Sequence, residues 1–314
     1  MSTLRAAVIG VGYLGRFHAQ KYAQSAQAEL VAVVDSREET RASLASELHT
    51  QALADYRELL GKIEAVSIAT PTPLHFAIAR DFLQAGAHVL VEKPITETAE
   101  QATELIDLAR SRGCVLQVGH LERFNPVIVG AIPHVRRPRF IECQRLAPYR
   151  ERGTDVNVVL DLMIHDIDLV QTLVDSPVAS VDSIGAQVFS GGIDIANARI
   201  RFENGCVANA TASRVSMKTE RKLRLFEDDT YLSLDLQQKI LTSIRKNPSS
   251  EPGQLPVTIG EQNFEQGDAL KAEIESFLSC CRAGGEPVVS GAAGLRALET
   301  AMLISDQLHR QSSR

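Results

Sequence analysis

The chain has 314 residues, of which 44% are hydrophobic and 23% are charged, and its formal net charge at pH 7 is −6. This composition is typical of a folded globular protein, and the length predicts about two domains. The acidic balance argues against a nucleic-acid partner or an anionic membrane surface. No apolar run approaches the ~18 residues of a membrane span. The first strand pattern follows almost directly on Met1, so we expect no signal peptide.

The five cysteines and eight histidines show no metal-ligand spacing. An odd number of scattered cysteines favours reduced structural thiols. We therefore expect a cytoplasmic protein without a metal site.

Short apolar runs alternate with helical patterns over the first 120 residues. The runs are apolar at every position, which is typical of strands covered on both faces in a parallel sheet. We expect strands at 6–9, 30–34, 65–68, 88–91 and 115–118, and helices at 14–24, 37–48, 73–86 and 98–113. This alternation predicts an α/β domain over residues 1–120, with the doubly wound parallel sheet of a Rossmann fold.

The first predicted strand leads into the glycine-rich turn "GVGYLG", where Gly10, Gly12 and Gly15 form the pattern G-x-G-x-x-G. Because the pattern follows a strand and opens a helix, it indicates a dinucleotide site. We expect the turn, including Tyr13 and Leu14, to hold the pyrophosphate at the helix N-terminus.

The second predicted strand ends in Asp35, twenty residues after the last glycine of the turn. A carboxylate there accepts hydrogen bonds from a ribose 2′-OH and repels a 2′-phosphate, which favours NAD over NADP. Arg37 argues the other way, because a guanidinium could receive that phosphate. On balance the sequence predicts NAD as the cofactor.

Two more turns follow buried strands in "IATPTPLH" (68–75) and "VLVEKP" (89–94). Ligands of an open parallel sheet bind beyond the carboxyl ends of its strands. The further candidates for cofactor binding in these turns are Thr70, Pro71, His75, Glu92 and Lys93. Taken alone, Lys93 would suit a solvated loop equally well, but this position favours a cation beside the nicotinamide.

From residue 121 the pattern changes to a long apolar helix at 156–174, then strands of alternating polarity, then a helical tail. We expect strands at 181–191, 194–205, 206–216, 221–228 and 230–236, and tail helices at 268–285 and 290–311. Asn204-Gly205 predicts a hairpin turn. Residues 121–314 are thus predicted to form an α+β domain with a large open, mostly antiparallel sheet, whose terminal helices could pack back on the first domain.

The long apolar helix carries Asp161 and His165 four residues apart, so we expect them on one helical face. A helix-stabilising pair, or a core histidine, is the more common explanation of this spacing. An acid/base pair is the alternative.

The sequence resembles the Gfo/Idh/MocA oxidoreductases over nearly its whole length. The resemblance rests on "GVGYLGRFHA", "IATPTPLH", "AGAHVLVEKP", "LDLMIHDIDL" and the tail "EIESFLSCCRAGGEPVVSGAAGLRALETA". It implies a Rossmann domain, an open-sheet domain that forms oligomer contacts, and oxidation of a sugar or cyclitol carbinol. By position, it implies that Lys93 contacts the substrate hydroxyl and that Asp161 and His165 are the acid/base pair. A histidine with a pKa near ~6.5 suits proton removal at neutral pH.

Two stretches, "VGHLERFNP" (118–126) and "DVNVVLDLMIHDID" (155–168), are most similar to a branch that oxidises the 3-hydroxyl of UDP-N-acetylglucosamine for diamino-sugar glycolipids. The substrate-binding candidates are Lys93, His120, Arg123, Arg150, Asp161 and His165, and Arg145 and Arg152 could also contact a pyrophosphate. A dehydrogenase of a free sugar or inositol is the alternative among enzymes. A non-catalytic, NAD-binding redox sensor is the alternative of another class.

A homodimer or homotetramer is expected through the sheet of the second domain. One face of that sheet would cover the domain's own helices, and Val188, Ile200 and Val207 would make the other face apolar. Exposed apolar faces of this kind usually bind a partner.

Overall fold

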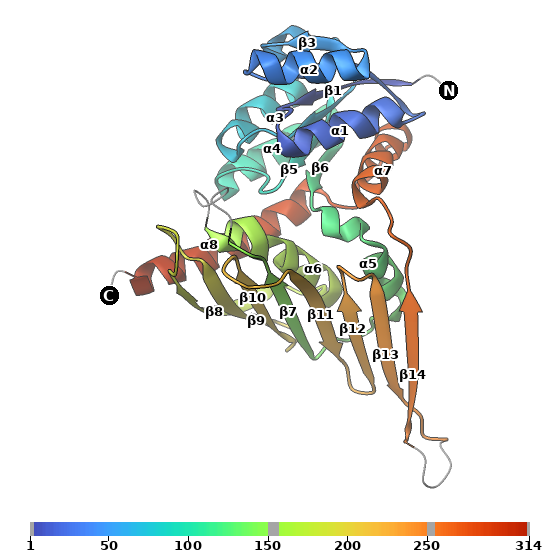
Figure 1. The fold of residues 1–314 in the computed structure, drawn as a ribbon, viewed down its shortest axis with the longest axis vertical. Helices are drawn as coiled ribbons and strands as arrows, with labels where there is room; N and C mark the ends of the chain where they lie inside the picture. The colour runs from blue at the N-terminus through green and yellow to red at the C-terminus, as the bar shows by residue number, and fades with distance from the viewer. Residues whose placement is uncertain (1–2, 150–156, 250–254, 313–314) are drawn as a thin grey trace. The chain divides into compact units, whose positions relative to one another are not determined.

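The computed structural model describes residues 3–149, 157–249 and 255–312. The chain divides into two compact units (Figure 1). The first unit comprises residues 1–124 and 268–298, and the second comprises residues 125–267 and 299–314. No helix within the described ranges is both long and apolar enough to span a bilayer.

The first unit contains a six-stranded parallel sheet in the order β3-β2-β1-β4-β5-β6. Its strands are β1 (Leu4–Ile9), β2 (Ala28–Val34), β3 (Gln51–Leu53), β4 (Ala65–Ile68), β5 (His88–Glu92) and β6 (Leu116–Gly119). Its α-helices are α1 (Tyr13–Gln24), α2 (Glu38–Leu48), α3 (His75–Gln84), α4 (Ala99–Arg112) and α7 (Ala269–Ala283). The predicted doubly wound sheet is confirmed, and its strand order reverses between β1 and β4, where ligands of such sheets bind.

Helices cover both faces of this sheet, with α1 and α7 on one face and α3 and α4 on the other (Figure 1). Residues 6–9, 32–34, 65–68, 89–92 and 116–119 of the strands between them are buried, which explains their continuous apolar runs. From the far end of the sequence, α7 brings Ile274 and Phe277 into the core cluster that contains Ala19 and Tyr22 of α1. The core of the first unit is therefore completed by a segment that follows the whole of 125–267.

The second unit contains an eight-stranded sheet in the order β14-β13-β12-β11-β7-β10-β9-β8. Its strands are β7 (Phe140–Leu146), β8 (Val178–Ala186), β9 (Ile195–Phe202), β10 (Val207–Ser213), β11 (Glu220–Phe226), β12 (Thr230–Asp235), β13 (Ile240–Lys246) and β14 (Val257–Asn263). Every pairing is antiparallel except that of β7 with β10, so the predicted mostly antiparallel sheet is confirmed. The Asn204-Gly205 turn joins β9 to β10 as expected, with Gly205 at φ +86°.

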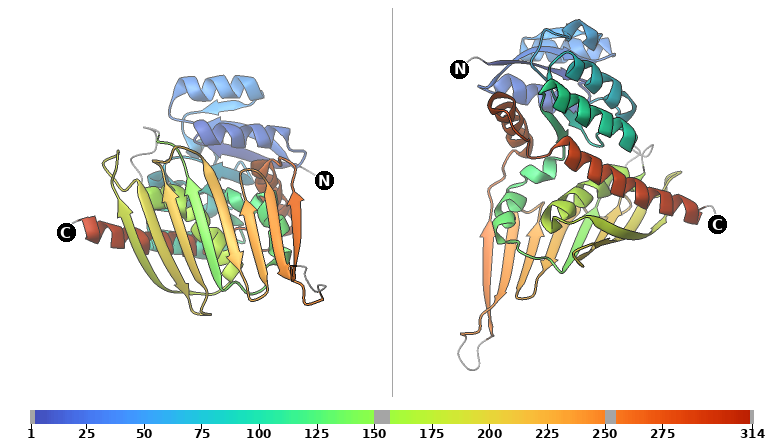
Figure 2. Two further views of the ribbon diagram at one scale, coloured as in Figure 1. Left: turned by 60° about the horizontal axis from the view of Figure 1, so that its bottom comes forward. Right: turned by 180° about the vertical axis from the view of Figure 1, so that it is seen from behind.

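One face of this sheet packs against α5 (Pro126–Ala131), α6 (Ile164–Val174) and the end of α8 (Gly291–Ser312) (Figure 2). Side chains of β9 alternate between the two faces, and Ile200 is fully buried on the helix-covered face. The prediction that Ile200 lies on the open face was therefore wrong. Side chains of a strand alternate between its two faces, so an alternation assigned one residue out of step puts each side chain on the opposite face. Val188 is half-exposed just beyond β8, and Val207 is partly buried at the start of β10.

A continuous apolar row crosses six strands on the other face. Strand register places its members directly opposite one another: Val207, Phe140, Phe226, Tyr231, Ile244 and Ile259. Ring centroids lie 5.7 Å apart for Phe140 and Phe226, and 5.0 Å apart for Phe226 and Tyr231. In Figure 2 (left) the strands are seen from this open side, with the helices of the unit behind them.

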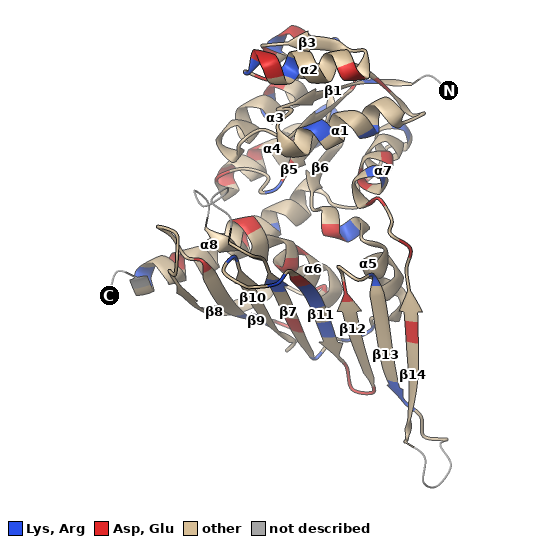
Figure 3. Ribbon diagram, viewed as in Figure 1, with Lys and Arg blue, Asp and Glu red and all other residues tan. Residues whose placement is uncertain are grey.

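Charges of both signs are interspersed over this sheet (Figure 3). The basic stretch of β11 is partly neutralised across the strands, where Arg224 lies 3.0 Å from Glu142 and Lys222 lies 3.7 Å from Asp235. The open face is therefore an apolar row bordered by paired charges.

Candidate functional site

The glycine-rich turn between β1 and α1 has the geometry that the fingerprint predicts. Gly10 has φ +80°, and a Cβ at this position would lie 2.8 Å from Cγ2 of Thr70. A Cβ at Gly15 would overlap the carbonyl oxygen of Gly10. A Cβ at Gly12 would meet no described atom closer than 3.9 Å, where Nη2 of Arg37 lies. Gly10 and Gly15 therefore allow the tight packing of the turn. Gly12 leaves the N-terminus of α1 open to a phosphate.

Asp35 is fixed at the end of β2 by backbone donors. The N–H of Val11 donates to Oδ2 at 3.0 Å, and the N–H of Arg37 donates to Oδ1 at 2.9 Å. The Asp35 side chain is 10% exposed, whereas that of Arg37 is 68% exposed, with Nε 3.7 Å from Oδ1. The carboxylate is thus held in place with lone pairs left for ribose hydroxyls, while the guanidinium extends toward solvent.

His75, at the start of α3, joins two of the predicted cofactor turns. Its Nε2 lies 2.8 Å from the carbonyl oxygen of Thr70, after β4, and its Nδ1 lies 2.9 Å from that of Pro94, after β5. Burial lowers the pKa of the imidazole, although the two carbonyl oxygens oppose this effect. The ring is 1% exposed. Any contribution of His75 to cofactor binding is therefore through the turns that it holds together.

Glu92 is also buried, and its Oε1 lies 3.1 Å from Nε2 of His18 on α1. Burial alone would raise the pKa of Glu92, but the hydrogen bond of His18 and the charge of Lys93 lower it. The backbone N–H of Lys93 lies 3.3 Å from Oε2 of Glu92. The side chain of Lys93 is partly exposed at the end of β5. Glu92, the last residue of β5, is thus buried, and Lys93, the next residue, is partly exposed.

Asp161 and His165 belong to the second unit, and both are partly exposed. The predicted helix begins with a π-helical turn, Val159–Met163, which precedes α6. Asn157 caps this turn, because its Oδ1 accepts from the N–H groups of Val159 and Leu160, at 3.0 Å each. Asp161 lies on the π-helical turn and His165 in the first turn of α6. Such turns often occur at functional sites.

The arginine candidates have different environments. Arg145 is buried, with Nε and Nη2 at 3.0 Å and 2.7 Å from the two carboxylate oxygens of Asp166. These side chains are only 4% and 5% exposed, so the ion pair is structural and the prediction that Arg145 contacts a pyrophosphate was wrong. Arg123 is partly exposed on the short helix η3 (Leu121–Phe124), next to the buried His120. Arg150 and Arg152 lie outside the described residues.

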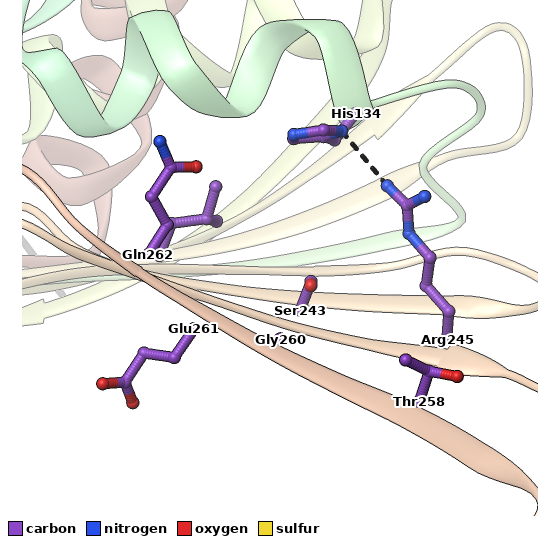
Figure 4. Close-up of a pocket in the computed structure, with 8 residues that line it drawn as sticks. His134, Ser243, Arg245, Thr258, Gly260, Glu261 and Gln262 are labelled. Carbon is purple, nitrogen blue, oxygen red and sulfur yellow. Dashed lines mark hydrogen bonds between the residues drawn. The ribbon is translucent and has the colours of Figure 1, made fainter.

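A surface pocket of about 340 Å³ lies in the second unit between β13, β14 and the short helix η4 (Ile132–His134) (Figure 4). His134 and Arg245 meet there, with Nδ1 and Nη2 3.2 Å apart. None of the candidate residues that the structure describes lines this pocket.

Within the first unit, the structure brings together the ends of β1, β2, β4 and β5, which carry the glycine turn, Asp35, Thr70, Pro71 and Lys93. This arrangement defines a dinucleotide-binding protein of the Rossmann type. Residues 4–120 match the domain described as the oxidoreductase family, NAD-binding Rossmann fold, and residues 133–231 match the Gfo/Idh/MocA C-terminal domain.

The comparison with known proteins extends over the whole chain. UDP-N-acetylglucosamine 3-dehydrogenase from Acidithiobacillus ferrooxidans is 40% identical over 97% of both chains. A solved structure of that enzyme superposes with a TM-score of 0.94 over 100% of both chains, at 39% identity. The NAD(+)-dependent scyllo-inositol 2-dehydrogenase of Bacillus subtilis is 26% identical over 91% of this chain and 89% of its own. The chain belongs to the Gfo/Idh/MocA family of NAD-binding oxidoreductases.

Proposed function

We propose that this protein is an NAD-dependent dehydrogenase of a nucleotide sugar, and that it oxidises the 3-hydroxyl of UDP-N-acetylglucosamine. The observation that carries this proposal is the 40% identity with a UDP-N-acetylglucosamine 3-dehydrogenase over 97% of both chains. Inositol 2-dehydrogenases of several bacteria are only 24% to 30% identical. The retained lysine, aspartate and histidine also argue against a non-catalytic redox sensor, which needs only the nucleotide site.

Oxidation of CH–OH to C=O removes a hydride and a proton. Bound at the glycine turn and Asp35, NAD would supply the acceptor for the hydride. His165 takes the hydroxyl proton, and Asp161 orients the imidazole. Lys93 stabilises the negative charge that grows on the oxygen as the proton leaves. In this proposal Arg123, with His120 beside it, contacts the diphosphate of the substrate.

The test is Lys93→Met, which keeps the aliphatic stem and removes the charge. Loss of one charge-stabilising donor lowers turnover by roughly 10²–10³-fold, whereas NAD affinity, measured by titration, is expected to remain. Lys62→Met, at an exposed lysine of the same unit, is the matched control. His165→Asn should also lower turnover, with partial recovery at high pH, where hydroxide can take the proton. If Lys93→Met turns over substrate at the wild-type rate, the proposed catalytic role fails.

A substrate panel separates the alternatives. NADH absorbance is followed with UDP-N-acetylglucosamine, free sugars and inositol, and an aminotransferase is coupled to remove a 3-keto product. Turnover only with the nucleotide sugar supports the proposal. Turnover with inositol or a free sugar would transfer the assignment to that substrate, and NAD binding without any turnover would favour the sensor.

We further propose that a second copy of the chain covers the open face of the second-unit sheet, and that the protein works in the cytoplasm. The apolar row from Val207 to Ile259 supports the first point, because Ile259 is 62% exposed in the single chain. The five free cysteines support the second. Light scattering should give the mass of a dimer or tetramer at micromolar concentration, and Phe226→Asp should reduce it. A wild-type monomer would contradict the interface.

A further inference from the structure

Three acidic or basic side chains from distant parts of the sequence meet inside the first unit. They are His18 of α1, Glu92 of β5 and Glu273 of α7, and one nitrogen or oxygen atom from each lies within 4.8 Å of the other two. The residues are 0%, 9% and 0% exposed, respectively. A Cβ at Gly119 would lie 2.7 Å from Oε1 of Glu92, so β6 leaves room for the carboxylate only because it has a glycine there.

His18 is part of an ordered chain of hydrogen bonds. Its Nε2 faces Glu92 at 3.1 Å, and its Nδ1 lies 3.3 Å from Oγ of Ser67 on β4. The hydroxyl of Tyr22 lies 2.9 Å from the same Oγ. If Tyr22 donates to Ser67 and Ser67 donates to Nδ1, the imidazole donates its Nε2–H to Glu92. In this direction every donor in the chain has an acceptor.

Glu273 has no such partner. Neither of its carboxylate oxygens makes a hydrogen bond to any described residue, although both are buried. Two ionised carboxylates this close in a buried site repel strongly, and one of them normally keeps a proton. Burial, and then the charge of Glu92, raise the pKa of the Glu273 carboxyl well above its usual range. Glu92 shifts in the opposite direction, so the proton belongs on Glu273.

We propose that Glu273 binds a proton and donates it to Glu92 in a buried carboxyl–carboxylate hydrogen bond, so that His18, Glu92 and Glu273 form a proton-binding triad. The proton lets α7 pack on the sheet without placing a second negative charge there. Its loss at alkaline pH leaves two buried carboxylates with one histidine and weakens this packing. The nearby titratable groups are Lys93 after β5 and His75 on α3, whose charges act on Glu92, and Tyr22 on α1, on which Glu273 and Cys281 act.

The pH dependence has a definite sign. The pKa of Glu273 is higher in the folded protein than in the unfolded chain, whose value is 4.5. The stabilisation it provides is therefore fully present below that pH and is lost as the pH rises toward the folded pKa. Glu273→Gln keeps the shape and a donor but cannot ionise. Its melting temperature should therefore match that of the wild type near pH 4.5 and exceed it increasingly up to about pH 9.

Infrared spectroscopy on the full-length protein observes the proton directly. At pH 7 the wild type should show the C=O band of a buried protonated carboxyl, and Glu273→Gln should lack it. The matched control is Glu286→Gln, at an exposed glutamate of the same unit, which should retain the band. No substrate enters either measurement, so the outcome is independent of the proposed function.

A bound divalent cation is the competing explanation, because two carboxylates and an imidazole also suit such an ion. In that case elemental analysis would find about one metal per chain, EDTA would lower the melting temperature, and Glu273→Gln would be destabilised at pH 7. Any of these results, or a wild type without the infrared band, would overturn the proton-binding triad.

Discussion

In the second unit, Arg145 and Asp166 meet through two hydrogen bonds of 3.0 Å and 2.7 Å, and neither side chain is more than 5% exposed. In the first unit, Glu92 and Glu273 lie with a single histidine in a site that is also buried. The first pair is neutral as a whole, because each charge has its counterpart. The second has two carboxylates beside one imidazole, and in our proposal a proton on Glu273 removes one of the two negative charges. The buried ion pair is balanced without a proton, whereas the stability of the buried glutamate site is expected to depend on pH.

A third arrangement uses the backbone. Asp194, fully buried after β8, accepts from the N–H groups of Val188, Phe189 and Ser190 at 2.9, 2.7 and 2.9 Å, and from the hydroxyl of Ser190. Burial would raise the pKa of Asp194, but these hydrogen bonds outweigh it and lower the pKa to about 2. Asp35 uses the same kind of donors at the cofactor site. Backbone donors thus hold both carboxylates, and an arginine lies near each: Nε of Arg214 is 3.9 Å from Asp194, and Nε of Arg37 is 3.7 Å from Asp35.

The largest effect is expected from Asp166→Ala, which leaves the Arg145 guanidinium buried without its carboxylate. Removing one partner of a buried pair costs about 3–5 kcal/mol of unfolding free energy, measurable by urea unfolding. The double variant Arg145→Met with Asp166→Leu should recover most of that loss. Asp182→Ala, at an exposed position of the same sheet, is the control and should change stability by less than about 0.5 kcal/mol. A loss of similar size in the control would contradict the comparison.

A smaller effect, dependent on pH, is expected from Asp194→Asn. The carboxyl pKa falls from 3.8 to about 2 on folding, which corresponds to roughly 2 kcal/mol at neutral pH. Because the folded pKa is depressed, this stabilisation is present above pH 3.8 and is lost as the pH falls through 2. The variant should be less stable than the wild type at pH 7, and the difference should shrink in acid. Stability measured from pH 2 to pH 7 tests this, and a difference that grows in acid would refute it.

The smallest effect is expected from Asp35→Ala. The variant loses the acceptor for the ribose 2′-OH and the repulsion of a 2′-phosphate, so the preference for NAD over NADP should narrow. A hydrogen bond to a charged group contributes about 1.5–3 kcal/mol. Because solvent reaches the site, we expect a value near the lower end, which corresponds to an approximately tenfold fall in the ratio of NAD affinity to NADP affinity. Titration of both dinucleotides measures it. An unchanged ratio would show that Asp35 does not contact the ribose.

Local patterns predicted the first unit well. The glycine turn, the buried strands and Asp35 lie close together in the sequence, and their roles follow from backbone conformation. The three-residue edge strand Gln51–Leu53 gave no usable pattern, because it is too short to show periodicity. Glu273 could not be recognised, because its importance depends on α7 returning to a strand encoded far earlier in the chain.

In the second unit the fold class was predictable, but several details were not. Strand Phe140–Leu146 shows a regular alternation of exposure, yet its buried face contains Arg145, and a charged residue normally argues against burial. The π-helical turn at Val159–Met163 has no sequence signal, because its residues would equally suit an α-helix.

The dependence of the first unit on α7 has a consequence for biosynthesis. Ile274, Phe277 and Leu278 belong to the same core cluster as Val8 and Tyr22. A ribosome that adds about 5–20 residues each second needs roughly seven to thirty seconds to pass from the end of the N-terminal segment to α7. During that time the nascent Rossmann sheet exposes the apolar surface that α7 later covers. A chaperone that binds apolar segments at the tunnel exit would therefore have its best opportunity on this protein before residue 268 emerges.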